Sequence, residues 1–163
     1  MRSLLPIGLL VSTVVLLAGC TSSDSSAGVA SPAPATPSPT RTTCASPIDF
    51  GPLPEWARAG FSGDSSMPHA MGDRGDIVAA IFGYPLAVSR PDGSSNKILW
   101  VSKVEAPPGD LVIEAKLDDS DVSVTRRVPG GPGPSIIDLP QHGCWHLNLS
   151  WPGHTDAMGL VYG

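Results

Sequence analysis

Charged residues are scarce in this chain, and the balance of their signs excludes one class of partner. Lys, Arg, Asp and Glu make up 15% of the 163 residues, and ten basic residues stand against fifteen acidic ones, for a formal net charge of −5. Nucleic-acid binding gains affinity from each cation that faces a phosphate. We therefore expect no nucleic-acid partner.

The motifs of common catalytic centres are missing from the sequence as well. It contains no G-x-S-x-G, no H-E-x-x-H and no phosphate-binding glycine loop with a lysine. The Gly-rich stretch 128–134 holds three prolines, which lack the N–H donors that an anion cradle needs. We therefore expect a non-catalytic protein without a cofactor.

One long hydrophobic run is present, and it lies at the N-terminus. Arg2 precedes the mostly apolar segment Leu4–Ala18, which is the pattern of an export signal. As a helix with a rise of about 1.5 Å per residue, fifteen residues extend roughly 22 Å, whereas a bilayer core is about 30 Å thick. Residues 1–19 are therefore predicted to be a cleaved signal peptide.

The end of this segment predicts how the protein is held at a membrane. Leu17-Ala18-Gly19-Cys20 resembles the lipobox of bacterial lipoproteins, in which small residues precede the cleavage point and the cysteine thiol is acylated. The resemblance implies that Cys20 becomes the lipidated first residue. Two or three acyl chains anchor a protein firmly, since each buried CH₂ contributes about 0.8 kcal/mol. The alternative is an ordinary cleaved signal.

A low-complexity segment of Pro, Ser, Thr and Ala follows. Residues 20–43 contain no aromatic residue and one Val, so they have too little apolar surface to offset the entropy of ordering. We expect a tether that leans to polyproline II and separates the domain from the bilayer. The alternatives are a Pro-rich ligand and a glycosylated stalk.

The remaining residues, 44–163, have the size of one domain and the pattern of an all-β protein. Short runs with alternating apolar residues are bounded by turns rich in Pro, Gly and Asp. We expect an immunoglobulin-like antiparallel β-sandwich, with a small β-barrel as the alternative. About seven strands are predicted, namely Asp76–Phe82, Lys97–Lys103, Asp110–Leu117, Val122–Val128, Ser135–Leu139, Cys144–Trp151 and Ala157–Tyr162.

Three cysteines are present, and acylation of Cys20 leaves Cys44 and Cys144. Two cysteines in an exported domain usually pair. Their bond closes a loop of about 100 residues, for which chain entropy gives up to about 4.7 kcal/mol. Because Cys144 alternates with Trp145, we expect a structural disulfide that pins the entry of the domain to a sheet edge or an outer face.

Histidines flank Cys144 and suggest a metal-binding alternative. In an extended strand His142, Cys144 and His146 share one face, and imidazole with thiolate suits copper or zinc. A disulfide at Cys144 would remove the central ligand. The favoured expectation is therefore no metal site, with His142 and His146 as the alternative ligands.

A ligand groove is a further expectation for the irregular segment 54–75. Long irregular segments are often functional, although these residues are expected mainly to close one end of the sandwich. Exposed aromatic rings stack on sugars, whereas buried rings fill a core. The candidates for a groove are Trp56, Phe61 and His69, together with Trp100.

Three stretches carry a family resemblance that covers most of residues 54–162. They are 96–101 (NKILWV), 131–136 (GPGPSI) and 143–151 (GCWHLNLSW), and they resemble a group of uncharacterised actinobacterial lipoproteins. The resemblance implies an envelope location and a β-sandwich, and it supplies no reaction. The sequence thus predicts a lipid-anchored protein on the extracytoplasmic side of the cell membrane, carrying a binding or accessory module for an envelope protein or a glycan.

Overall fold

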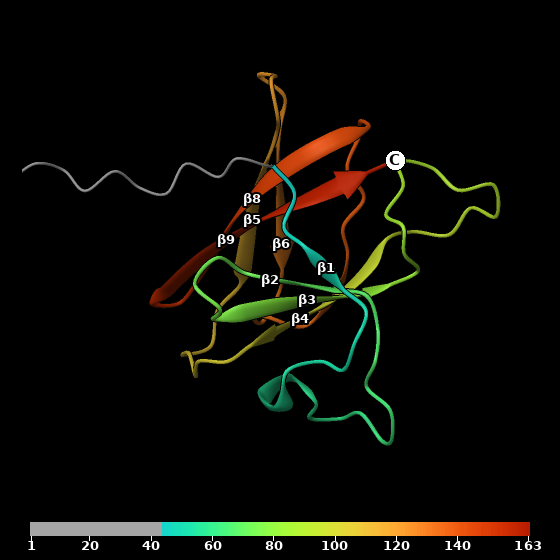
Figure 1. The fold of residues 1–163 in the computed structure, drawn as a ribbon. Helices are drawn as coiled ribbons and strands as arrows, with labels where there is room; N and C mark the ends of the chain where they lie inside the picture. Colours follow the sequence, from blue (N-terminus) through green and yellow to red (C-terminus); the bar gives the residue numbers. More distant parts are fainter. Residues whose placement is uncertain (1–43) are drawn as a thin grey trace, which may run out of the picture. The chain divides into compact units, whose positions relative to one another are not determined.

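The computed structural model describes residues 44–163, which form two antiparallel β-sheets packed face to face (Figure 1). The predicted signal peptide, Cys20 and the tether to residue 43 lie outside the described residues. One sheet has the order β1-β2-β3-β4-β7 and the other the order β6-β5-β8-β9. The strands are β1 (Ile48–Asp49), β2 (His69–Met71), β3 (Ile77–Phe82), β4 (Lys97–Ser102), β5 (Leu111–Leu117), β6 (Ser123–Val128), β7 (Pro134–Ile136), β8 (Gly143–Trp151) and β9 (His154–Tyr162).

This arrangement confirms the predicted all-β sandwich, and the alternative of a small barrel is wrong because the two sheets do not close on each other. Each of the seven predicted strands corresponds to an observed one, from β3 to β9. Strands β1 and β2 have only two and three residues and were not predicted from the sequence. The irregular segment 54–75 contains one 3-10 turn, Glu55–Ala57.

The turns follow from the residues that occupy them. A two-residue connection, Pro152-Gly153, joins β8 to β9, and Gly153 has φ +79°, a conformation that glycine adopts without strain. In the β5–β6 hairpin the amide of Leu117 donates to the carbonyl of Val122, and Asp119 has φ 52° at the tip. The short loops keep successive strands antiparallel.

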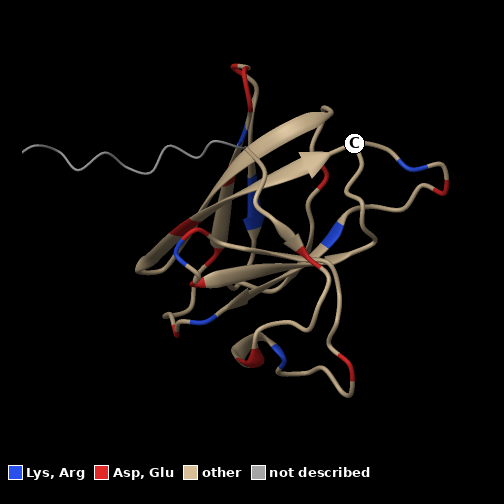
Figure 2. Ribbon diagram, viewed as in Figure 1, with Lys and Arg blue, Asp and Glu red and all other residues tan. Residues whose placement is uncertain are grey.

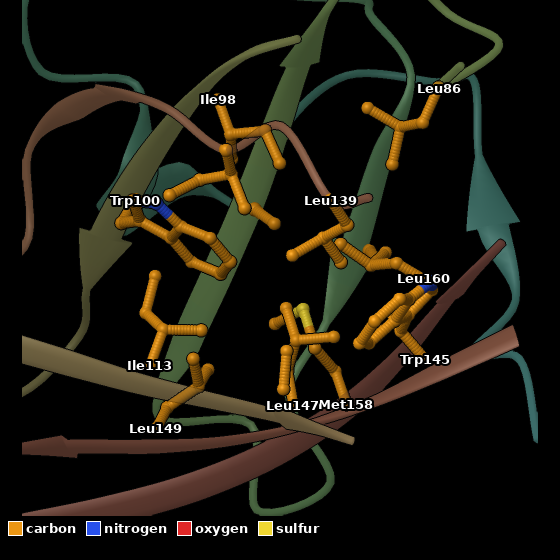
Figure 3. Packing of buried hydrophobic residues seen from close by; sticks show 14 of the residues in the cluster. Leu86, Ile98, Trp100, Ile113, Leu139, Trp145, Leu147, Leu149, Met158 and Leu160 are labelled. Carbon is orange, nitrogen blue, oxygen red and sulfur yellow. The ribbon is translucent and has the colours of Figure 1, made fainter. Parts of the chain in front are cut away.

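The main core lies between the sheets and is built by alternation along each strand. In β8 every second side chain points inward, from Trp145 through Leu147 and Leu149 to Trp151, and all four are buried. The inward side chains of β4 face them from the other sheet, and those of β9 lie beside them in the same sheet (Figure 3). The inner face of β8 thus follows the alternation of apolar and polar residues in its sequence.

Strand β3 is buried on both faces, so it carries an almost unbroken apolar run. Its residues Val78 and Ala80 face away from the main core and are covered by Leu53 and Ala57, with Trp56 and Phe61 packed alongside. The irregular segment therefore covers the outer face of the five-stranded sheet. The expectation that it mainly closes one end of the sandwich is therefore wrong.

Candidate functional site

The Cys44–Cys144 disulfide joins the entry of the domain to β8, as predicted, with Cα atoms 6.0 Å apart. The chain beside it is also held by hydrogen bonds. The amide of Ser46 donates to the carbonyl of Gly159 over 2.9 Å, and the Gly159 amide donates to Ser46 Oγ over 3.0 Å. The entry segment is therefore fixed on the outer face of the β8–β9 pair.

Gly159 makes this close approach possible. It lies opposite His146 in the β8–β9 register, and a Cβ at residue 159 would overlap the carbonyl of Cys44. The absence of a side chain lets the Cys44 backbone rest directly on the sheet. As a result, Cys44 comes to the same patch of surface as Cys144 and His146.

Asp118 completes this group from the end of β5. Its amide donates to the carbonyl of Cys144 over 2.8 Å, and its Oδ1 lies 3.1 Å from Nε2 of His146. Single ligand atoms from Cys44, Asp118 and His146 all lie within 4.8 Å of one another. We call these three residues, together with Cys144, the disulfide cluster.

The surroundings of the disulfide cluster are open and acidic. The side chains of His146 and Asp118 are 43% and 46% exposed, and they border a hollow of about 410 Å³ that Asp119, Asp121 and Lys116 also line. Acidic residues gather at the tip of the adjoining β5–β6 hairpin (Figure 2). A cation therefore has access to the cluster and a favourable local charge.

His142 does not belong to this cluster, although the sequence analysis grouped it with His146. It precedes β8, which begins at Gly143 with φ +130°, so the extended alternation that would align the two histidines does not reach residue 142. The potential ligands that lie beside His146 are instead Cys44 and Asp118. Neither was recognised from the sequence as a neighbour of His146 in such a group.

Two of the four groove candidates have no exposed ring. Trp100 is 1% exposed and its Nε1 donates to Ser135 Oγ over 3.0 Å, so it is a core residue. His69 is 5% exposed, with Nδ1 2.8 Å from the carbonyl of Met67. Trp56 and Phe61 are half-buried and pack over β3. The expected stacking surface at Trp100 is therefore corrected to an interior position.

Exposed apolar residues gather instead at one end of the five-stranded sheet. Phe82 and Ile136 both pair with Lys97 across the sheet. Phe50 and Tyr84 form an edge-to-face pair with ring centroids 5.4 Å apart. We call these four exposed residues the apolar end: Phe50 (59% exposed), Phe82 (40%), Tyr84 (43%) and Ile136 (58%).

A hollow of about 460 Å³ lies beside Phe82 and Ile136, with Arg90 and Lys97 in its wall. Nη2 of Arg90 donates to the carbonyl of Pro85 over 2.6 Å and to Asn96 Oδ1 over 3.1 Å, which fixes the loop after β3. The apolar end was missed from the sequence because Phe82 continues the apolar run of a buried strand.

Comparisons with known proteins give no relative on which to base a function. No family model, curated protein or solved structure matches the chain. Among residues 44–163 there is also no helix long and apolar enough to cross a membrane.

Proposed function

We propose that this chain is an exported lipoprotein, anchored through Cys20 to the extracytoplasmic side of the cell membrane, whose domain is a non-catalytic binding or accessory module. The segment that ends at Cys20 supports the anchor by its resemblance to a lipobox. The disulfide supports an oxidising compartment, because such bonds persist mainly in exported proteins.

The observation that carries the binding role is the apolar end. Four of the five exposed large apolar side chains in the described residues belong to it, Val161 being the fifth. Apolar residues that gather on a surface often mark interaction sites, and protein interfaces are enriched in aromatic residues and arginine. The partner proposed is a protein of the cell envelope that covers Phe82 and Ile136 and meets the cations Arg90 and Lys97 with acidic groups.

A glycan is the second candidate for the partner, and it would have to bind at residues other than Trp100. Sugar stacking needs an exposed ring face, and Trp100 has none. Phe50 and Tyr84 are exposed, but they already contact each other edge to face. A protein partner accounts better for an apolar end that includes the aliphatic Ile136.

The test places a photo-crosslinking amino acid at residue 136 in the full chain within its native envelope. We expect an adduct with one defined protein. The same amino acid at Thr125, an exposed position on β6 in the other sheet, serves as the control and is expected to give none. With the crosslinking amino acid at residue 82, Ile136→Ser should abolish the adduct. Val161→Ser, which changes another exposed apolar residue, should leave the adduct unchanged.

Identical adducts from residues 136 and 125 would contradict the proposed surface. A crosslink to peptidoglycan or another glycan would replace the protein partner by the second candidate. The absence of any adduct at the apolar end would contradict the proposal that this surface binds a partner.

A further inference from the structure

The disulfide cluster holds four metal-binding side chains on three separate stretches of the chain. Cys144 and His146 lie on β8, Asp118 follows β5, and Cys44 belongs to the entry segment. Cys44, Asp118 and His146 place their ligand atoms within 4.8 Å of one another, and the sulfur of Cys144 is bonded to that of Cys44. The same small volume therefore contains two sulfurs, an imidazole nitrogen and a carboxylate oxygen.

These positions are fixed by contacts other than the disulfide. Ser46, which is 5% exposed, exchanges two hydrogen bonds with Gly159 and so keeps the entry segment on the sheet. The amide of Asp118 is bound to the carbonyl of Cys144, and the registers of β5 and β9 against β8 hold the strands. None of these contacts passes through the S–S bond itself.

We propose that the Cys44–Cys144 disulfide is the oxidised state of a zinc site, and that reduction lets Cys44, Cys144, His146 and Asp118 bind one Zn²⁺. Two thiolates, one imidazole and one carboxylate are established zinc ligands and supply the four positions of a tetrahedral site. The Cα atoms of the two cysteines, 6.0 Å apart, leave room for the sulfurs to separate around an ion. This inference does not depend on the lipid anchor or on the apolar end.

The conversion balances with a dithiol as reductant. The dithiol transfers two electrons and two protons to the S–S bond, which breaks into two thiols, and the dithiol itself becomes a disulfide. Zinc then displaces the two thiol protons to solvent, and His146 and Asp118 supply an imidazole nitrogen and a carboxylate oxygen as the other two ligands. In the oxidised state the sulfurs are not thiolates, so zinc binds only after reduction.

The test uses the full chain with Cys20→Ala, purified in detergent, so that only the two cluster sulfurs remain. The disulfide is reduced with a phosphine and one water, which give a phosphine oxide and the two thiols, and the protein is titrated with Co²⁺ as a spectroscopic substitute for Zn²⁺. We expect one equivalent to give sulfur-to-cobalt charge-transfer absorption and the visible bands of tetrahedral Co²⁺. Zn²⁺ should remove both signals, and the unreduced protein should show neither.

Matched variants show whether the folded cluster, rather than two free thiols, binds the ion. His146→Ala and Asp118→Asn should weaken binding by roughly tenfold or more, since even partners behind a metal ligand change affinity by about 10–100-fold. His142→Ala is the control for the imidazole. Glu105→Gln is the control for the carboxylate, because Glu105 is exposed and does not line the hollow beside the cluster. Both controls should bind as the parent does.

Three results would overturn the proposal. One is the absence of tetrahedral cobalt bands in the reduced protein, and another is equal binding by the cluster variants and their controls. The third is a collapse of amide dispersion in the NMR spectrum on reduction, because an unfolded chain would not hold His146 and Asp118 beside the sulfurs. A Cys144→Ser variant, which frees Cys44 without any reductant, should bind Co²⁺ more weakly through the three remaining ligands.

Discussion

The carboxylate of Asp156 lies so close to Gly72 that a Cβ on residue 72 would overlap it. Asp156 is 5% exposed, and its two oxygens accept hydrogen bonds from the amides of Arg74, over 2.9 Å, and Asp76, over 3.1 Å. Because Asp156 lies on β9 and the two amides lie in the β2–β3 turn, this carboxylate joins one sheet to the other. The contact fixes the backbone of the Arg74-Gly75-Asp76 turn.

Gly72→Ala should therefore destabilise the domain by about 1–3 kcal/mol, the usual cost of forcing extra atoms into a packed site. The measurement is the urea midpoint of unfolding. Gly133→Ala is the matched control, because a Cβ there meets only an ordinary contact at 3.7 Å. Equal midpoints for the two variants would contradict the close Gly72–Asp156 contact.

Two buried tryptophans should respond differently to replacement by phenylalanine. Nε1 of Trp100 donates to Ser135 Oγ, whereas Nε1 of Trp151 is buried and has no partner among the described residues. Trp100→Phe loses a hydrogen bond, which contributes about 1 kcal/mol, and Trp151→Phe removes an unsatisfied donor. Trp100→Phe should therefore be the more destabilising of the two by about that amount in urea unfolding. The reverse order would mean that Nε1 of Trp151 is bonded in solution.

Asp138 should contribute to the loss of folding stability that the domain shows in acid. Burial acts to raise its pKa, but hydrogen bonds from the backbone and side chain of Asn96, another from Ser95 and the charge of Arg126 outweigh burial and lower the pKa below its usual value. A depressed pKa stabilises the fold above the pKa of the unfolded chain, near 3.9. That contribution is lost as the pH falls through the folded value.

Asp138→Asn should accordingly flatten the fall in the free energy of unfolding between about pH 5 and about pH 2. It should also lower stability at neutral pH, because the amide cannot accept hydrogen bonds from Asn96 with a full charge. Urea midpoints over that pH range measure both effects. An unchanged slope would show that Asp138 has the same pKa in the folded and unfolded states.

Ser46 should hold the entry segment when the disulfide is open. In the reduced protein, Ser46→Ala removes the acceptor of the Gly159 amide and should speed hydrogen exchange at that amide, with a loss of about 1 kcal/mol of local stability. The oxidised Ser46→Ala protein should show a smaller effect, since Cys44 remains bonded to Cys144. Equal exchange rates in both redox states would contradict this role.

Alternation explains why the strands could be predicted from the sequence and some side-chain roles could not. In β8, and in β5 apart from Val112, apolar and polar residues alternate, so the inner face of each follows directly. In β4 apolar residues occupy both faces, because Leu99 and Val101 pack with the segment that covers the outer face of β3. The sequence therefore did not distinguish a buried Trp100 from an exposed one.

The cluster and the apolar end depend on contacts between segments far apart in the chain. Asp118 lies 28 residues from His146, and Cys44 lies 100 residues from Cys144. The pairing of the cysteines could be predicted because two thiols in an exported domain usually bond. The approach of Asp118 depends on the β5–β8 register, and no local motif encodes it.

Mass spectrometry of the N-terminal peptide from the membrane-bound protein tests the proposed lipoprotein most directly. The proposal predicts that the peptide begins at Cys20, carries a diacylglyceryl group on the sulfur, and is absent from membranes when Cys20 is replaced by serine. A chain that begins elsewhere, or one with a free Cys20 thiol that still remains in the membrane fraction, would contradict the lipid anchor.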